Sequence, residues 1–124
     1  MATSYKVVTR KYGASEVPAY ECDIHHTQGD ALVIDYTITQ SSGNPTVPTA
    51  ATLKIAPAKG ATATVSTAMT VTDNTENYTV AKTVEGSTMD IAAGTYYYQV
   101  EETYSSGTPL TKLEGRLYIE EDVG

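Results

Sequence analysis

The chain has 124 residues, a formal net charge of −7, 21 Thr, 11 Val, 6 Ile and 10 Tyr, but only 5 Leu and no Phe or Trp. This length fits one domain, and β-branched residues and tyrosine favour pleated, half-buried strands. The counts predict an all-β domain with a tyrosine-rich core, and they exclude a helical bundle, a Rossmann domain, a TIM barrel, a membrane span and a disulfide scaffold.

Residues 1–29 are predicted to form an N-terminal arm with one possible edge strand. Residues 4–9 have an extended pattern, Gly13 and Pro18 interrupt it, and residues 20–24 form a second short extended piece. No signal peptide precedes the arm, so we expect a protein made in the cytoplasm.

Charge is distributed unevenly along the chain. Lys6, Arg10 and Lys11 lie near the start, whereas Glu120, Glu121 and Asp122 lie near the end. A basic start and an acidic finish suit contacts between neighbouring copies, and an ordinary solvated surface is the alternative. The acidic total disfavours a nucleic-acid partner, because phosphate backbones are repelled.

The remaining residues, 30–124, alternate as strands. Residues 31–39 have a period of two, with one face predicted to point inward: Leu32, Ile34, Tyr36 and Ile38. A Gly/Pro-rich loop follows at 40–48, and residues 51–55 alternate until Pro57. Residues 60–71 predict two short strands or an irregular hairpin, and residues 78–84 predict another strand.

The last third predicts a crossover and a hairpin. Residues 87–94 form the crossover, with Met89 and Ile91 packed into the core, and residues 95–104 and 110–120 pair across a turn. In the final strand Leu113, Leu117 and Ile119 are phased inward, and Gly115 is predicted to be either a bulge or a point of close approach. The expected architecture is a single antiparallel immunoglobulin-like sandwich of seven or eight strands.

Cys22, Asp23, His25 and His26 are the densest group of metal-capable side chains. The chain has no second cysteine and no third histidine to complete a usual set of four ligands. On a strand His25 and His26 point to opposite faces, so they cannot readily share one ion. We expect no metal or other cofactor here.

No catalytic constellation is apparent, and we expect a protein that is not an enzyme. Glu101 and Glu102 point to opposite faces of a strand, and no Gly-x-Ser-x-Gly or glycine-rich phosphate loop occurs. The acidic end at 120–122 offers weak calcium ligands, but a solvated tail is the preferred interpretation.

Tyr96, Tyr97 and Tyr98 form an unusual run in a predicted strand. Tyr96 and Tyr98 are expected in the core, and Tyr97 on the outer face, where tyrosine is typical of interfaces. The predicted contact residues are Tyr5, Lys6, Arg10, Lys11, Tyr12, Tyr20 and Tyr97.

Four segments carry a resemblance to a known family: Gly29 to Thr39, Pro48 to Ile55, Ala93 to Glu101 and Leu113 to Val123. Their order resembles the immunoglobulin-like sandwich of tailed-phage virion proteins, most closely the N-terminal domain of baseplate upper proteins. Similar sandwiches occur in capsid decoration and head-fibre proteins. The chain stops at Gly124, where baseplate upper proteins continue into receptor-binding modules.

The resemblance implies a structural component of the virion without an active site. Its first expected role is a capsid-surface decoration protein that docks through the arm and one sandwich face onto the major capsid protein. A baseplate or tail adaptor is an alternative, as is a carbohydrate- or receptor-binding module built on Tyr97, Tyr104 and residues 41–46. A homo-oligomer, or many copies on one lattice, is expected, with neither nucleic acid nor membrane as a partner.

Overall fold

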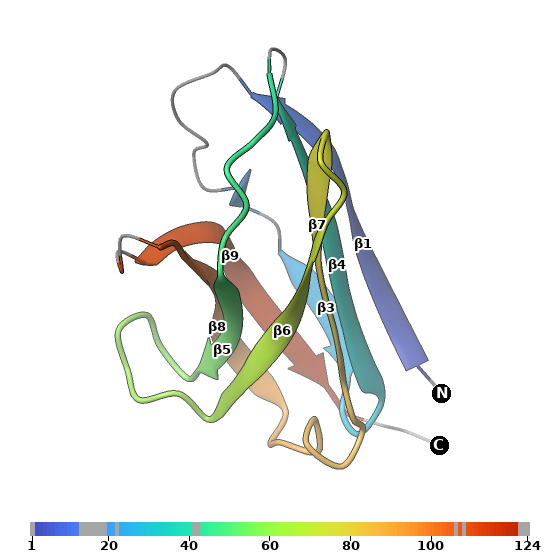
Figure 1. Ribbon diagram of the computed structural model, residues 1–124. Coiled ribbons are helices and arrows are strands. Elements are labelled where there is room, and N and C mark those ends of the chain that lie inside the picture. Colours follow the sequence, from blue (N-terminus) through green and yellow to red (C-terminus); the bar gives the residue numbers. More distant parts are fainter. Residues whose placement is uncertain are drawn as a thin grey trace.

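The structure is a computed structural model that describes residues 2–12, 20–21, 23–40, 43–105, 107 and 109–121. Every regular element in these residues is a strand, which confirms the all-β class (Figure 1). The strands are β1 (Ala2–Tyr12), β2 (Tyr20–Glu21), β3 (Ile24–Thr27), β4 (Ala31–Gln40), β5 (Ala50–Ala56), β6 (Val65–Asp73), β7 (Asn77–Val84), β8 (Gly94–Thr103) and β9 (Pro109–Glu120). Residues 13–19, Cys22 and residues 122–124 lie outside the described part.

The strands form two sheet faces that share one strand and close into a nearly complete barrel. Their order is β1-β4-β7-β6-β5-β8-β9-β2, and β3 also pairs with β9. Residues 65–69 of β6 pair with β5, and its residues 70–73 pair with β7. β6 therefore passes from one face of the sandwich to the other without a break.

The antiparallel prediction holds from β4 to β9 but is wrong at both ends of the sheet. β1 pairs with β4 in parallel, and β2 and β3 pair with β9 in parallel. The chain passes from one sheet face to the other between β1 and β2 instead of making a hairpin. The described residues form nine strands, where seven or eight were predicted for the chain.

Two local predictions are also corrected. Residues 60–71 do not form a hairpin: Gly60 has φ +84° in a turn closed by Ala61 N–H donating to Ala58, and one long strand, β6, begins at Val65. The bulge of β9 lies at Lys112 and not at Gly115, since the register shifts between Val100–Leu113 and Glu101–Thr111. The division of the chain at residue 29 stays a prediction.

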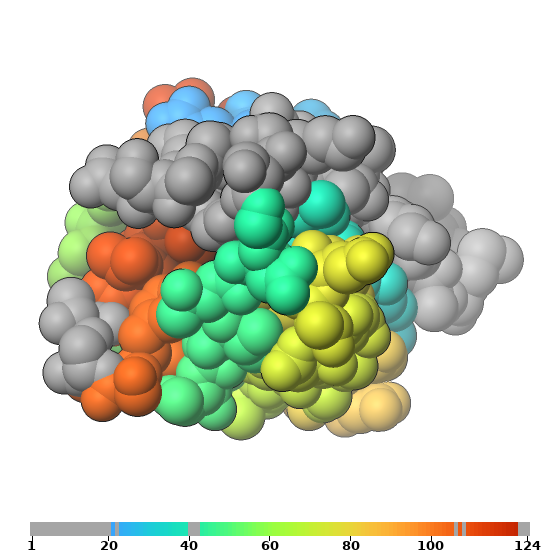
Figure 2. All heavy atoms as spheres, turned by 45° about the horizontal axis from the view of Figure 1, so that its top comes forward, coloured from blue at the N-terminus to red at the C-terminus, as the bar shows by residue number. Residues whose placement is uncertain are grey.

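The core follows the predicted alternation. The inward face of β4 is 0–3% exposed, and the predicted residues Met89, Leu113, Leu117 and Ile119 are buried. Ile91 and Tyr96 pack partly buried against this core. Val47, in the loop before β5, packs against this core. Figure 2 shows the segment that leads into β5 (green) between residues of β8 and β9 (orange) and the β6–β7 turn (yellow).

The start of β4 depends on two glycines that touch. Gly29 has φ +82° in the turn between β3 and β4, a conformation that glycine adopts without strain. A Cβ atom added at Gly86 would lie 2.3 Å from the carbonyl oxygen of Gly29. The two backbones can approach this closely only because Gly86 has no side chain.

We expect Gly86→Ala to lower the free energy of unfolding by about 1–3 kcal/mol, the usual cost of forcing atoms into a packed site. Urea denaturation followed by circular dichroism measures the change. Ser87→Ala, at the exposed neighbouring position, is the matched control and should change stability by less than about 0.5 kcal/mol. Equal stabilities of the two variants would contradict the close approach.

Candidate binding groove

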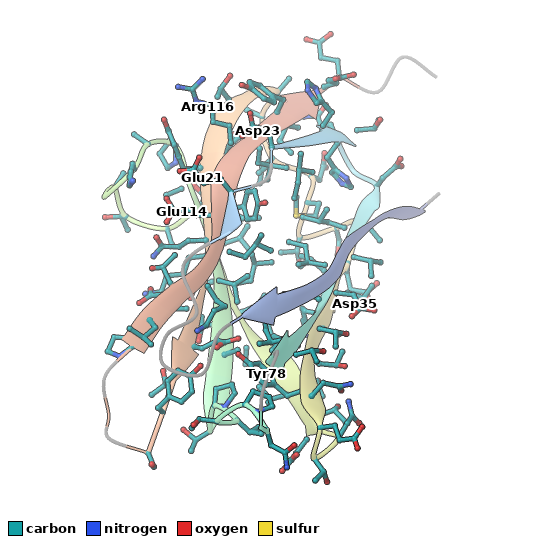
Figure 3. The ribbon with its side chains drawn as sticks, turned by 90° about the horizontal axis from the view of Figure 1, so that it is seen from above. Glu21, Asp23, Asp35, Tyr78, Glu114 and Arg116 are labelled. Atoms are coloured by element: carbon teal, nitrogen blue, oxygen red, sulfur yellow. The ribbon has the colours of Figure 1, made fainter. Side chains whose placement is uncertain are left out.

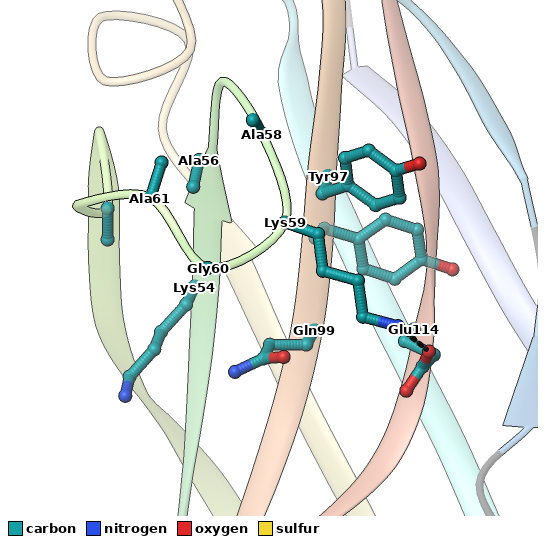
Figure 4. A pocket seen from close by; sticks show the side chains of 11 residues that line it. Lys54, Ala56, Ala58, Lys59, Gly60, Ala61, Tyr97, Gln99 and Glu114 are labelled. Carbon is teal, nitrogen blue, oxygen red and sulfur yellow. Dashed lines mark ion pairs between the residues drawn. The ribbon is translucent and has the colours of Figure 1, made fainter.

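A groove lies on the outer face of β5, β8 and β9. Residue alternation points Lys54, Tyr97 and Glu114 outward, and the register sets Lys54 beside Gln99 and Ala56 beside Tyr97. The loop 57–64 contains Ala58, Gly60, Ala61 and Ala63. Because these side chains are small, they leave a cavity of about 270 Å³ beside the Tyr97 ring (Figure 4).

A second hollow of about 320 Å³ continues the first toward β2. The two hollows share Lys59, Tyr97 and Glu114, and the second adds Glu21, Asp23, Gly115 and Arg116. Figure 3 shows Glu21, Asp23, Glu114 and Arg116 on the same side of the molecule, with Asp35 on the opposite sheet. We call the two hollows together the Tyr97 groove.

Arg116 is fixed beside the Tyr97 ring. Its Nε–H donates to the Tyr97 hydroxyl over 3.4 Å, and its Cζ lies 5.9 Å from the ring centroid. Its backbone N–H donates to Asp23 Oδ1 over 3.0 Å, which ties β9 to the segment before β3. Hydrogen bonds to Tyr97 and then to Tyr118 raise the pKa of Arg116 above its ordinary value, so the guanidinium stays charged.

Exposed ion pairs border the groove. Lys59 Nζ lies 3.5 Å from Glu114 Oε1, and Lys54 Nζ lies 2.7 Å from Glu101 Oε1. Figure 4 shows Lys59 extending from its loop past Tyr97 to Glu114. Such surface pairs contribute about 0–1 kcal/mol, so a partner with charges of its own can replace them at little cost.

A second polar cluster lies inside the barrel. Glu102 is completely buried, and its carboxylate accepts hydrogen bonds from the hydroxyls of Tyr36, Tyr78 and Tyr104 over 2.6–2.7 Å. Lys112 Nζ lies 3.7 Å from the same carboxylate and is itself buried. The β9 bulge turns the Lys112 side chain inward, which is a usual effect of a bulge.

Burial changes the protonation behaviour of this cluster. Loss of solvent, followed by the charge of Glu102, raises the pKa of Tyr36 and Tyr78 well above 10.0. Burial and the hydrogen bond to Glu102 also raise the pKa of Tyr104. Burial lowers the pKa of Lys112, and the attraction of Glu102 opposes part of that change. The cluster is closed to a ligand, so we assign it to stability.

The predicted opposite orientations of His25 and His26 are confirmed. His25 is exposed, stacks on Tyr118 with centroids 4.7 Å apart and lies 3.2 Å from Glu120 Oε1. His26 is buried, and its Nε2–H donates to the Asp30 carbonyl over 2.8 Å. Among the described residues no three His, Cys, Asp or Glu side chains gather to hold a metal ion. Cys22 lies outside that part.

The structure separates the predicted contact residues into two groups. Tyr5, Lys6, Arg10, Lys11 and Tyr12 lie on β1, next to β4. Tyr20 lies on β2 beside Leu113, and Tyr97 lies on β8 and lines the groove. The structure describes the backbone of the first six, and of these seven only Tyr97 has a described side chain.

The predicted glycan platform is not assembled. Tyr97 lies within β8 and Tyr104 directly follows that strand, seven residues later. At about 3.3 Å per residue, their backbones are about 23 Å apart. Tyr104 also donates its hydroxyl to the buried Glu102, so its ring is not free as a platform. The loop 41–46 lies partly outside the described residues.

Sequence reasoning missed most of the groove. In the sequence, Lys59 and Arg116 resemble ordinary surface cations. Only the pairing of β8 with β9 places Arg116 opposite Tyr97. The burial of Glu102 could have been predicted, because a period of two puts its side chain on the same face of the strand as Tyr98 and Val100. The burial of Lys112 could not have been predicted, since a bulge determines which face of the strand its side chain points to.

The described fold is thus a small all-β domain with a polar, tyrosine-centred groove on one sheet face. The described residues include no helix that is long and apolar enough to cross a membrane. No known protein family matches the sequence, and no curated protein is similar to it.

Two solved structures resemble the chain at low identity. A chain from the structure of PbICP-C in complex with falcipain-2 is 12% identical, with a TM-score of 0.48, over 92% of this chain and 98% of that one. The N-terminal domain of phage TP901-1 ORF48 is 10% identical, with a TM-score of 0.41, over 92% of this chain and 99% of that one.

Proposed function

We propose that this chain is a structural, non-catalytic component of a tailed-phage virion, an adaptor of the tail or baseplate that binds a neighbouring virion protein through the Tyr97 groove. The observation that carries the binding role is the groove itself, with Tyr97 and Arg116 in mutual contact at its centre. Tyrosine and arginine are enriched in protein interfaces and among the residues that dominate their binding energy.

The virion part of the proposal rests on the resemblance in the sequence. Its segments occupy the expected places: Gly29 and Asp30 directly precede β4, Gly94 begins β8, and β9 ends in acidic residues at Glu120. The nearest pattern is that of baseplate upper proteins, so we place the adaptor in the tail or baseplate. The capsid-surface role is the competing placement within the same virion.

Fractionation of virions distinguishes these placements. Virions from cultures that express the gene are dissociated, heads and tails are separated by sedimentation, and the chain is quantified in each fraction by mass spectrometry. We expect it with tails at a fixed number of copies. Recovery with heads would replace the adaptor by a decoration protein. Absence from both fractions would overturn the virion role.

Tyr97→Ala should weaken binding of the purified protein to tails that lack it by tenfold or more, since a central aromatic residue typically contributes at least about 1–2 kcal/mol to an interface. Co-sedimentation with purified tails measures the change. Lys82→Ala, on the outer face of β7 in the opposite sheet, is the matched control and should bind normally. Equal binding by both variants would mean that another surface docks.

A further inference from the structure

We propose that β1 is exchanged between two copies of this chain, so that β1 of one copy pairs with β4 of the other in the same parallel register. Within the described strands, β1 lies at the end of the sheet order and forms its backbone ladder with β4 alone. A strand held by one ladder can be supplied by its own chain or by a second copy with the same contacts. This inference goes beyond the proposed function and does not depend on it.

The connection between β1 and the rest of the chain is long enough for exchange. β1 ends at Tyr12 beside Gln40, and β2 begins at Tyr20 beside Leu113 on the other sheet face. Eight residue steps reach about 27 Å when extended, whereas packed sheets lie about 10 Å apart. The connection therefore has length to spare when β1 pairs within its own chain, and that length can carry β1 to a neighbour.

The charges of the strand and of the rest of the chain suit a donor strand from a second copy as well as one from the same chain. Residues 2–12 contain three basic and no acidic residues, whereas the other 113 residues contain five basic and fifteen acidic ones, a net charge of −10. In the ladder Lys6 is the register partner of Asp35. An acidic body attracts this basic strand equally well whether it comes from the same chain or from another.

Concentration decides between the two arrangements. Because a short connection joins β1 to the rest of its own chain, the effective concentration of β1 for its own β4 is in the millimolar range. Dilute protein therefore keeps β1 within the chain, and copies crowded to comparable concentrations exchange it. Reciprocal exchange between two copies closes a two-fold dimer and leaves no unpaired β4 edge.

Single-cysteine variants test the exchange in full-length protein carrying Cys22→Ser. Ser4 and Val33 are register partners, and neighbouring strands lie within disulfide reach. Ser4→Cys and Val33→Cys chains are mixed, refolded together at increasing concentration and oxidised. Mass spectrometry then counts disulfide-linked heterodimers, and an excess over the collisional background of the control pair shows that β1 of one chain lies on β4 of the other. We expect their yield to rise with concentration.

Val33 and Thr83 provide the matched control, because they are register partners on β4 and β7 inside one barrel. Mixed Val33→Cys and Thr83→Cys chains should give few heterodimers at every concentration. A chain carrying both Ser4→Cys and Val33→Cys shows whether the pair closes at all. Closure only within this double variant, with no excess of heterodimers over the control, would overturn the exchange, as would failure of the double variant to close.

Discussion

Glu102→Ala should lower the free energy of unfolding by about 3–5 kcal/mol, which is a large part of the 5–15 kcal/mol that stabilises a typical domain. The substitution removes the acceptor of three tyrosine hydroxyls and the counter-charge of Lys112, all at one buried point. Buried donors without an acceptor and a buried cation without an anion are each costly. Urea denaturation followed by circular dichroism measures the loss.

The adjacent residue gives a strict control for this experiment. Glu101 has the same carboxylate and the same strand, but it points outward and pairs with Lys54 on the surface. Glu101→Ala should cost at most about 1 kcal/mol. If the two variants were equally stable, the buried cluster would contribute nothing beyond a surface pair. If Glu102→Ala does not fold, Glu102→Gln, which keeps an acceptor oxygen, should recover part of the stability.

Above pH 10 the domain should lose stability steeply. The pKa values of Tyr36 and Tyr78 are raised in the folded state, because burial and the Glu102 charge oppose their ionisation. A raised folded-state pKa contributes stability that is present below the unfolded pKa of about 10 and is lost as the pH rises above it. Each tyrosine that ionises only on unfolding costs about 1.4 kcal/mol per pH unit, so Tyr36 and Tyr78 together give about 2.7 kcal/mol per pH unit, and the raised pKa of Tyr104 adds a third contribution.

Parallel titrations by tyrosinate absorbance and circular dichroism check this prediction. The tyrosinate absorbance of Tyr36 and Tyr78 should appear only together with unfolding, and Tyr36→Phe should remove about a third of the slope, because Tyr78 and Tyr104 remain. The lowered pKa of Lys112 acts in the opposite direction, since the folded state then binds fewer protons, and stability gains from it until about pH 10.5. Ionisation of all ten tyrosines with the fold intact would contradict the cluster.

The alternating strands were predictable because burial on one face determines them locally. β4 and β8 each bury every second residue, and a period of two in the sequence reports this directly. The prediction for residues 60–71 was wrong for a related reason. Ala and Thr are compatible both with the loop before Val65 and with the strand that begins there. Their weak contrast does not fix where the strand begins.

Long-range pairing could not be derived from the sequence. The parallel ladders of β1, β2 and β3 depend on how the chain crosses between sheet faces, which no local pattern encodes. One residue of the Tyr97 groove was predictable, because Tyr97 was expected on the outer face of its strand. Arg116 and Lys59 were not, since the pairing of β8 with β9 brings Arg116 to the groove and a loop of small residues brings Lys59. The inward direction of Lys112 depends on one bulged residue, and single-residue register shifts leave no periodic signal.

β6 gives the two faces of the domain a common backbone, because its first half belongs to one ladder and its second half to the other. A pull on the groove side is therefore carried to the β4–β7 side along covalent bonds and not only across packed side chains that can slip. The two sheets cannot shear apart along this wall without breaking the hydrogen bonds of β6 itself. A component that transmits load between its neighbours in a particle gains stiffness from such a shared strand.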